Sequence, residues 1–322
     1  MFPPDFVKQA VLIHTRPGDL VFDPFSGRGT TLLEASLLGR RAIASDLNPV
    51  AFCISAAKAK PPQLGRLLRF IDELEEEYSQ RGRERSDSQG ALPEFFSVAF
   101  HRSTLSQILF LRRRLQWRSR VLDRFVAALL LAQLHGEVDH SPNFFSNQMP
   151  HTISTKPAYS IRYWRRHRLA PPRRDVFQIL KAKAAFRLAC GTAPAGVRVR
   201  LADVRRVARA FPSDHGCVST VITSPPYLDV TAFEEDQWLR LWFLGGPPRP
   251  TWGLYSRDDR HRSDGRYWQF LKEAWVGISP LLKSTATIVC RVGSLRFSVA
   301  ELEAKLRTSL KGVWSQVRLL DG

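Results

Sequence analysis

The sequence predicts an α/β fold in which a doubly wound, mostly parallel sheet carries a helical, basic insertion. Two apolar strands, 20–22 and 41–45, are separated by a helical segment, and a later apolar strand ends at Ser224. Strands that alternate with helices form parallel sheets covered by helices on both faces. A chain of 322 residues with 44% hydrophobic content can bury the core that such a sheet needs.

The N-terminal part of the chain contains the clearest alternation. We expect strands over 20–22 and 41–45 and helices over 5–14, 30–38 and 48–59. Gly39 ends the second helix, because glycine readily adopts the left-handed backbone conformation found at helix C-termini. Pro61-Pro62 ends the third, because proline cannot continue a helix. The sheet resumes at Val197–Leu201, whose alternating apolar residues predict a strand that ends at Asp203.

A glycine-containing turn follows the first strand. The run Asp23-Pro-Phe-Ser-Gly-Arg-Gly-Thr-Thr31 places Gly27 and Gly29 directly before a helix opened by two threonines. Glycines let a ligand approach the backbone closely, and the helix N-terminus offers unpaired N–H groups to a carboxylate. The turn lacks the third glycine of the dinucleotide pattern, since position 32 is leucine. Asp46, after the second strand, is placed to hold a ribose diol, as in other nucleotide-binding α/β units.

The strand that ends at Ser224 runs into two prolines and an aromatic ring. Pro225 and Pro226 fix φ and lack N–H groups, so that neighbouring carbonyls can point outward as acceptors. Acceptors can grip an exocyclic amino group while Tyr227 stacks on the ring that bears it. The motif therefore favours a site for a planar, amino-bearing base, with a plain proline turn as the alternative.

Residues 61–194 are too many for a loop and too apolar for disorder, so we expect a mainly helical insertion. An amphipathic helix is predicted over 64–80, a polar loop over 81–90, and one long or two shorter helices over 101–135. The net charge of the chain is +18, and residues 95–174 contain 14 Lys/Arg against 3 Asp/Glu. This distribution indicates a polyanionic partner, with genome composition as an alternative source of part of the arginine excess.

The sharpest basic feature is the segment 156–174, in which six arginines are interleaved with aromatic residues. Guanidinium groups neutralise phosphates, and planar aromatics stack on or wedge between bases. Against the alternative of a basic helix that contacts nothing, we predict nucleic-acid contacts from Lys156, Arg162, Tyr163, Trp164, Arg165, Arg166, Arg168, Arg173 and Arg174. A loop over 245–265, containing Trp252, Tyr255 and Arg257, is a second candidate contact region that could close over a substrate.

The cysteines exclude several classes of site. Cys53, Cys190, Cys217 and Cys290 are far apart and lack the C-x-x-C spacing of zinc sites, so we expect reduced thiols and no bound metal. No Pro-Cys motif is present, which argues against a covalent thiol adduct. The N-terminus lacks the pattern of a signal peptide, and the longest apolar run, 125–131, is shorter than a membrane span. The sequence thus predicts a soluble, cytoplasmic protein.

Three motifs together resemble those of amino-group DNA methyltransferases that use S-adenosylmethionine: Asp23–Thr31, Ser45–Pro49 and Thr223–Tyr227. Ser-Pro-Pro-Tyr, rather than Asp-Pro-Pro-Tyr, resembles the N4-cytosine branch. The resemblance covers residues 1–60 and 195–295 and implies a Rossmann-like methyltransferase fold. It implies a catalytic and cofactor-binding domain of residues 1–60 and 195–322, and a DNA-recognition domain of residues 61–194.

The resemblance also implies roles for individual residues. The implied catalytic residues are Ser224, Pro225, Pro226 and Tyr227. The implied contacts to S-adenosylmethionine come from Phe6, Asp23, Phe25, Ser26, Gly27, Gly29, Thr30, Thr31, Asp46, Leu47 and Asp203. Among them, Phe6 would lie at the methionine end of the cofactor and Asp203 would reach its adenine amino group.

The implied reaction is direct methyl transfer to the N4 amine of a cytosine flipped out of double-stranded DNA, with no metal. A cognate restriction endonuclease is a further partner that such a modification enzyme can have. Three other functions stay open: N6-adenine methylation with the same geometry, an RNA amino-methyltransferase, and a non-catalytic DNA-binding subunit of a modification complex. The intact motifs at Gly27, Gly29, Asp46 and Ser224–Tyr227 argue against the last of these.

Overall fold

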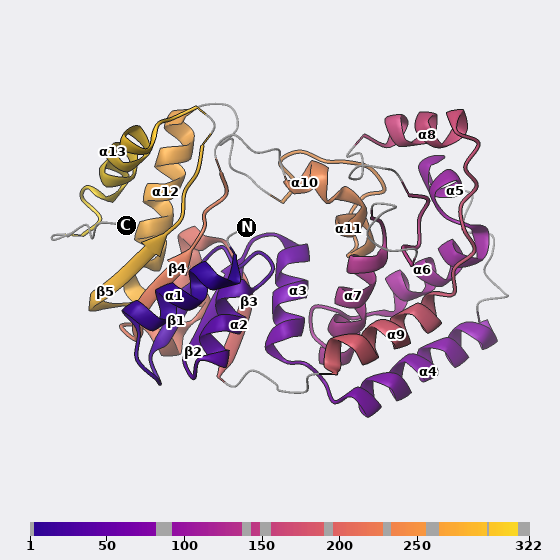
Figure 1. The fold of residues 1–322 in the computed structure, drawn as a ribbon, viewed down its shortest axis with the longest axis horizontal. Helices are drawn as coiled ribbons and strands as arrows, with labels where there is room; N and C mark the ends of the chain where they lie inside the picture. The colour runs from indigo at the N-terminus through magenta and orange to yellow at the C-terminus, as the bar shows by residue number, and fades with distance from the viewer. Residues whose placement is uncertain are drawn as a thin grey trace. The chain divides into compact units, whose positions relative to one another are not determined.

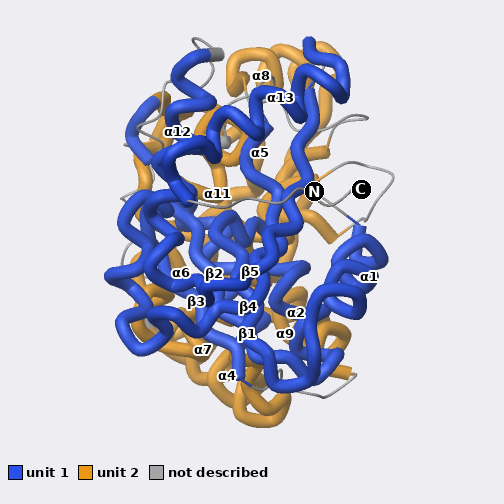
Figure 2. Tube along the Cα trace, turned by 90° about the vertical axis from the view of Figure 1, so that its left-hand side faces the viewer, with its two compact units in different colours: residues 1–59, 194–232, 253–322 blue, residues 60–193, 233–252 orange. Residues whose placement is uncertain are grey.

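The computed structural model describes residues 3–81, 92–136, 143–148, 156–189, 196–227, 233–255, 264–294 and 296–314. The chain divides into two compact units, shown in different colours in Figure 2. Unit 1 contains residues 1–59, 194–232 and 253–322, and unit 2 contains residues 60–193 and 233–252. Both units are therefore assembled from separate stretches of the chain. The predicted polar loop beyond Arg81, together with Cys190 and Arg257, lies outside the described residues.

Unit 1 is built on a parallel sheet, which confirms the predicted fold class. In the described part of the chain the sheet has five strands in the order β3-β2-β1-β4-β5, and every pairing is parallel. The strands are β1 (Leu20–Asp23), β2 (Arg41–Asp46), β3 (Val197–Leu201), β4 (Val218–Thr223) and β5 (Leu282–Cys290). The order runs outward from β1 in one direction and from β4 in the other, as in Rossmann-like folds, so the topological switch lies between β1 and β4.

Helices cover both faces of this sheet (Figure 1). One face is covered by α1 (Pro4–His14), α2 (Thr30–Leu37) and α3 (Pro49–Ala59). The other is covered by the 3-10 helix η2 (Val204–Ala210) and by α12 (Asp264–Ile278), on which α13 (Val299–Leu310) packs. Two short 3-10 turns, η3 (Pro212–Asp214) and η4 (Ser279–Leu281), complete the unit. The helices and strands predicted for the N-terminal part of the chain are present at these positions.

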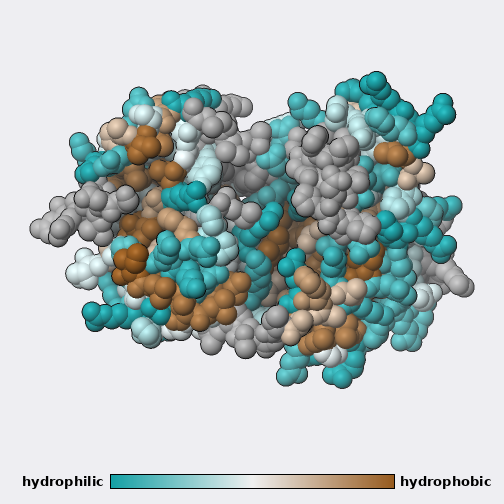
Figure 3. Space-filling model, viewed as in Figure 1, coloured by the Kyte–Doolittle hydropathy of each residue, from teal (hydrophilic) through white to brown (hydrophobic). Residues whose placement is uncertain are grey.

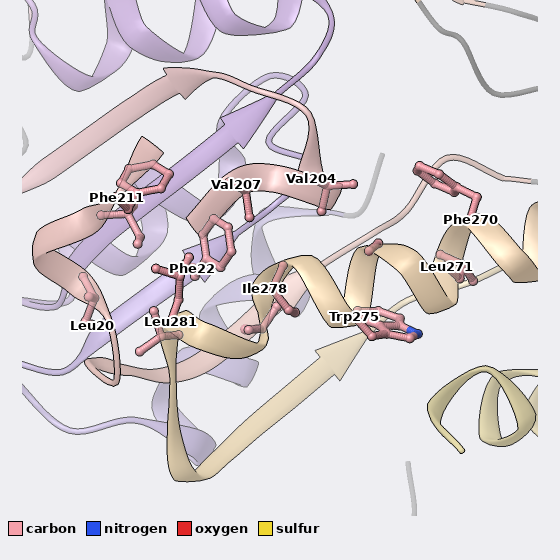
Figure 4. Close-up of a cluster of buried hydrophobic side chains, with 14 of the residues drawn as sticks. Leu20, Phe22, Val204, Val207, Phe211, Phe270, Leu271, Trp275, Ile278 and Leu281 are labelled. Atoms are coloured by element: carbon pink, nitrogen blue, oxygen red, sulfur yellow. The ribbon is translucent and has the colours of Figure 1, made fainter. Parts of the chain in front are cut away.

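The core of unit 1 forms where alternate residues of the strands meet α12 and η2. Leu20 and Phe22 of β1 lie in one cluster with Val207, Trp275 and Ile278, and all five are buried (Figure 4). Alternation places Val21 and Asp23 on the opposite face of β1. The carboxyl group of Asp23 therefore lies at the end of β1, on the face opposite this core.

Unit 2 is helical in its described residues. Its helices are α4 (Leu64–Arg81), α5 (Phe95–Ala99), α6 (Arg102–Arg114), α7 (Val121–Gln133), α8 (Pro157–Arg166), α9 (Val176–Leu188), α10 (Phe233–Asp236) and α11 (Trp238–Phe243). The segment predicted over 101–135 is two helices, α6 and α7. Among the described residues, no helix has the length and apolar character that crossing a membrane requires.

Residues 233–252 differ from the sequence-based boundaries, because they belong to unit 2 rather than to the sheet. Trp238 and Trp242 pack on Phe95 and Phe96, with ring centroids 4.9 and 4.5 Å apart. The Arg112 guanidinium donates to the carbonyl of Trp242 over 2.8 Å. These contacts hold α11 within unit 2, although it follows the Ser-Pro-Pro-Tyr motif closely in sequence.

Candidate active site

The carboxyl ends of β1, β2 and β4 bring the predicted motifs to one edge of the unit 1 sheet. β1 ends at Asp23, β2 at Asp46 and β4 at Thr223, directly before Ser224. Open parallel sheets bind ligands outside the carboxyl ends of their strands, at the point where the strand order reverses. Here that point lies between β1 and β4, which are the strands that carry the glycine turn and the Ser-Pro-Pro-Tyr motif.

Gly27 and Gly29 occupy the turn for different structural reasons. Both adopt left-handed backbone angles, with φ of 50° at Gly27 and 76° at Gly29. A Cβ on Gly29 would lie 3.1 Å from the Cβ of Ser55 on α3, so packing requires glycine there. A Cβ on Gly27 would meet nothing nearer than a carbonyl oxygen at 3.9 Å. The backbone at Gly27 is therefore the part of the turn that a ligand can approach.

The end of β2 holds this turn in place. The Gly27 and Asn48 amides each donate to one carboxylate oxygen of Asp46, both over 2.9 Å. The Ser26 amide donates to the carbonyl of Ser45 over 3.0 Å, and Ser26 itself is buried with its hydroxyl against Ser55. A carboxylate has about four acceptor positions, and ribose hydroxyls are hydrogen-bond donors, so the chemistry of Asp46 is compatible with a ribose.

Asp23 and Thr31 face the protein interior. The Asp23 side chain accepts from the Phe25 amide over 3.1 Å and from the Thr223 hydroxyl over 2.7 Å. Burial raises the pKa of Asp23 from 3.8 to about 6, although hydrogen bonds from Thr31, Thr223 and Phe25 act in the opposite direction. The single hydrogen of the buried Thr31 hydroxyl is shared between this carboxylate and the carbonyl of Ile222, which lies 3.3 Å from the hydroxyl oxygen. The Asp23 and Thr31 side chains thus connect β1 and α2 with β4.

The Ser-Pro-Pro-Tyr motif forms a compact turn after β4. The Ser224 hydroxyl donates to the Tyr227 hydroxyl over 3.3 Å, and Pro225 is buried. Gly293, beyond the end of β5, lies beside the aromatic ring: a Cβ at this position would be 3.8 Å from the ring of Tyr227. Sequence reasoning missed both Thr223 as a hydrogen-bond donor and Gly293 as a neighbour, because each contact joins residues that are distant in sequence.

The other predicted cofactor residues lie at four places in unit 1. Leu47 and Thr30 are half-buried beside Asp46 and at the start of α2. Phe6 on α1 lies under the guanidinium of Arg291, which is 5.7 Å from the ring centroid. The ring of Phe25 packs on Phe270 with centroids 5.9 Å apart.

Asp203 begins η2 and is engaged by Arg205. Its carboxylate accepts from the Arg205 amide over 3.0 Å and forms an ion pair with the guanidinium at 2.5 Å. Partial burial raises the pKa of Asp203, but the hydrogen bonds and charge of Arg205 outweigh it and hold that pKa below its ordinary value. The residue is thus an ionised acceptor just after β3.

Unit 2 contains the predicted nucleic-acid contacts. Five arginines of the basic segment are exposed, together with Lys156: Arg162, Arg165, Arg166, Arg168 and Arg173. Arg165 pairs with Glu94, and Arg174 is half-buried. Tyr163 is half-buried, with its ring 4.4 Å from His167.

Trp164 corrects one prediction. This residue is fully buried, its ring lies 5.7 Å from Phe95, and its indole N–H donates to the carbonyl of Gln148 over 3.1 Å. A side chain enclosed in this way cannot stack on a base. Trp164 is therefore a core residue of unit 2, and its predicted contact with nucleic acid is wrong.

The structure describes three of the four cysteines. Cys53, Cys217 and Cys290 are free thiols. No group of three or more His, Cys, Asp or Glu side chains that could hold a metal ion occurs among the described residues.

Fold and site together define a Rossmann-like α/β protein with a glycine turn, a strand-end carboxylate and a Ser-Pro-Pro-Tyr turn at the switch point. Comparison with known proteins agrees over the N-terminal part. A family model described as DNA methylase, of the N6/N4 methyltransferase type, matches residues 1–57. Over 55 residues the chain is 38% identical to the Type II methyltransferase M.MvaI of Kocuria varians. That alignment covers 17% of this chain and 12% of the relative.

Proposed function

We propose that this protein is an S-adenosylmethionine-dependent DNA methyltransferase that methylates the exocyclic N4 amine of cytosine. The observation that carries the proposal is the placement of Ser224–Tyr227 directly after β4, beside the glycine turn of β1 at the topological switch. The similarity of residues 1–57 to DNA methylases supports its coarser part, a methylase that acts on DNA. The short coverage of the curated relative leaves substrate and partners as inferences from the site.

The residues around the glycine turn suit the cofactor. The N-terminus of α2, which follows the half-buried Gly27, would receive its methionine carboxylate, and Asp46 would accept its ribose hydroxyls. Leu47 would contact the adenosine, and Asp203 would accept its adenine amino group. S-adenosylmethionine, when bound, supplies a methyl group on a positively charged sulfur. The direct contacts assigned to Ser26, Asp23 and Thr31 are replaced by supporting roles, because their side chains are buried.

The Ser-Pro-Pro-Tyr turn suits an amino group. The Ser224 and Tyr227 hydroxyl oxygens lie 3.3 Å apart, and a serine oxygen has two lone pairs, so Ser224 can accept from a substrate amine. Two acceptors, Ser224 and the Pro225 carbonyl, would hold the two N–H bonds of the amine and direct its lone pair toward the methyl group. Tyr227 would stack on the flipped base. Catalysis of this kind depends on orientation and on preorganised polar groups.

The exposed cations of α8 and the residues after it would contact the DNA backbone. The surface over α8 is hydrophilic in Figure 3, in line with the exposure of Arg162, Arg166 and Arg168. Arginine and lysine bind phosphates without reading sequence, so this surface would position duplex DNA. Association with a restriction endonuclease and a cytoplasmic location remain predictions from the sequence.

N6-adenine methylation is the second candidate, because the matching family model includes both N6 and N4 enzymes. The same two acceptors would hold the amino group of adenine. An RNA substrate or a non-catalytic role has no specific observation in its favour.

The proposal is tested by Ser224→Ala, because alanine removes an acceptor without adding bulk. Methyl transfer to duplex DNA should fall about 100-fold, whereas the affinities for S-adenosylmethionine and for DNA should change little. Ser219→Ala is the matched control, since Ser219 is on the same strand and its hydroxyl donates to the carbonyl of Leu20. Equal losses of DNA binding and of transfer in Ser224→Ala would contradict the assigned role.

A further inference from the structure

Thr223 is the last residue of β4 and is fully buried, directly before Ser224. Backbone pairing between β1 and β4 ends at Phe22 and Val221. Beyond that pair, the Thr223 hydroxyl donates to the carboxylate of Asp23 over 2.7 Å. A side-chain hydrogen bond therefore extends the connection between the two strands past the end of their backbone ladder.

The acceptor of this bond is fixed by the glycine turn. The Asp23 carboxylate also accepts from the Phe25 amide, within the turn, and from the Thr31 side chain on α2. Asp23 is 2% exposed, so its carboxylate is enclosed by donors from the turn, from α2 and from β4. On its other side, Thr223 pairs with Cys290 of β5, and its carbonyl accepts from the Arg291 amide over 3.0 Å. Thr223 is thereby held from both neighbouring strands.

We propose that Thr223 is a positioning residue for methyl transfer, whose hydroxyl fixes the Ser224–Tyr227 turn relative to the glycine turn through Asp23. This inference rests on the proposed function and adds a residue that touches neither cofactor nor base. In-line transfer is sensitive to displacements of about 1 Å between the reacting groups. A hydrogen bond between the two turns controls that separation more directly than strand pairing that stops two residues earlier.

Two substitutions separate the hydroxyl from the shape of the side chain. Thr223→Val keeps the branched shape and removes the hydroxyl, whereas Thr223→Ser keeps the hydroxyl and removes a methyl group. Both are measured as full-length proteins for S-adenosylmethionine affinity by calorimetry and for the single-turnover rate of methyl transfer to duplex DNA at saturating cofactor. Near-ultraviolet circular dichroism establishes that each variant is folded.

In Thr223→Val the single-turnover rate should fall about 10-fold or more, the size expected for a lost hydrogen bond to a charged group. Cofactor affinity should change less than about 3-fold, because Asp23 keeps its other donors. In Thr223→Ser the rate should stay near that of the wild type. Wild-type rates in both variants, or equal losses of rate and cofactor affinity in both, would overturn the assignment.

Measurements on the wild-type protein test the proposed function separately from the role of Thr223. A wild-type chain that binds no S-adenosylmethionine and transfers no methyl group would overturn the function, and this inference with it. A wild-type chain that is active alongside an equally active Thr223→Val variant would overturn only the role of Thr223.

Discussion

The raised pKa of the buried Asp23 carboxyl group makes the stability of the folded protein depend on pH. Its folded-state pKa of about 6 lies above the ordinary 3.8, because burial disfavours the charged form. A raised carboxyl pKa means that the folded protein holds the proton more tightly than the unfolded chain. The stability that this group contributes is therefore fully present below pH 3.8 and is lost as the pH rises through about 6.

Asp23→Asn tests this sign. The difference between 3.8 and about 6 corresponds to on the order of 3 kcal/mol of unfolding free energy. The free energy of unfolding of the wild type minus that of the variant should therefore decrease as pH rises from 4 to 7, measured by urea denaturation. Subtracting the variant cancels the titration of the other groups. A difference that stays constant across this pH range would contradict the raised pKa of Asp23 and the dominance of burial over its hydrogen bonds.

Residues whose role depends on local pattern could be predicted from the sequence. Gly27 and Gly29 predict a tight turn between a strand and a helix, and both have left-handed backbone angles in the structure. The bond between Thr223 and Asp23 could not be predicted, because it joins residues 200 positions apart. Trp164 misled the prediction, since an aromatic residue among arginines resembles a base-stacking pattern. Its neighbour at helical spacing, Ser160, is also buried and marks the inner face of α8.

At the scale of elements, α8 divides into a buried and a charged face. Trp164 fixes the helix to unit 2, while Arg162 and Arg166 remain exposed. An anchored helix presents its cations with less loss of conformational entropy than a free segment would. The element therefore suits backbone phosphate binding even though its tryptophan does not contact nucleic acid.

Replacing Arg162 and Arg166 by glutamine should weaken duplex binding about 10-fold near 0.1 M salt. It should also reduce the slope of log affinity against log salt by about 2, because the variant makes two fewer phosphate contacts and so releases fewer counterions on binding. The control removes the same charge from unit 1 through Arg209→Gln and Lys272→Gln, both at exposed positions. Fluorescence anisotropy over a salt series provides both values. Equal weakening by the two pairs would show that total charge, rather than α8, determines affinity.

At the scale of the whole molecule, the alternation of strands and helices was sufficient to predict the class of the sheet and the helical insertion. The membership of residues 233–252 in unit 2 was not predictable, because it depends on Trp238 and Trp242 packing against aromatic residues far earlier in the chain. The net charge of +18 predicts a polyanionic partner without naming it. In the proposed function, the Ser224–Tyr227 site on unit 1 restricts that partner to one bearing an exocyclic amine.

The most direct test of the central claim is transfer of a labelled methyl group from S-adenosylmethionine to mixed genomic DNA, followed by digestion and mass analysis of the nucleosides. We predict label in N4-methylcytosine. Label in N6-methyladenine would keep the reaction and reverse the choice of base at Ser224. DNA that remains unlabelled while the protein binds S-adenosylmethionine would contradict the claim that this chain methylates DNA.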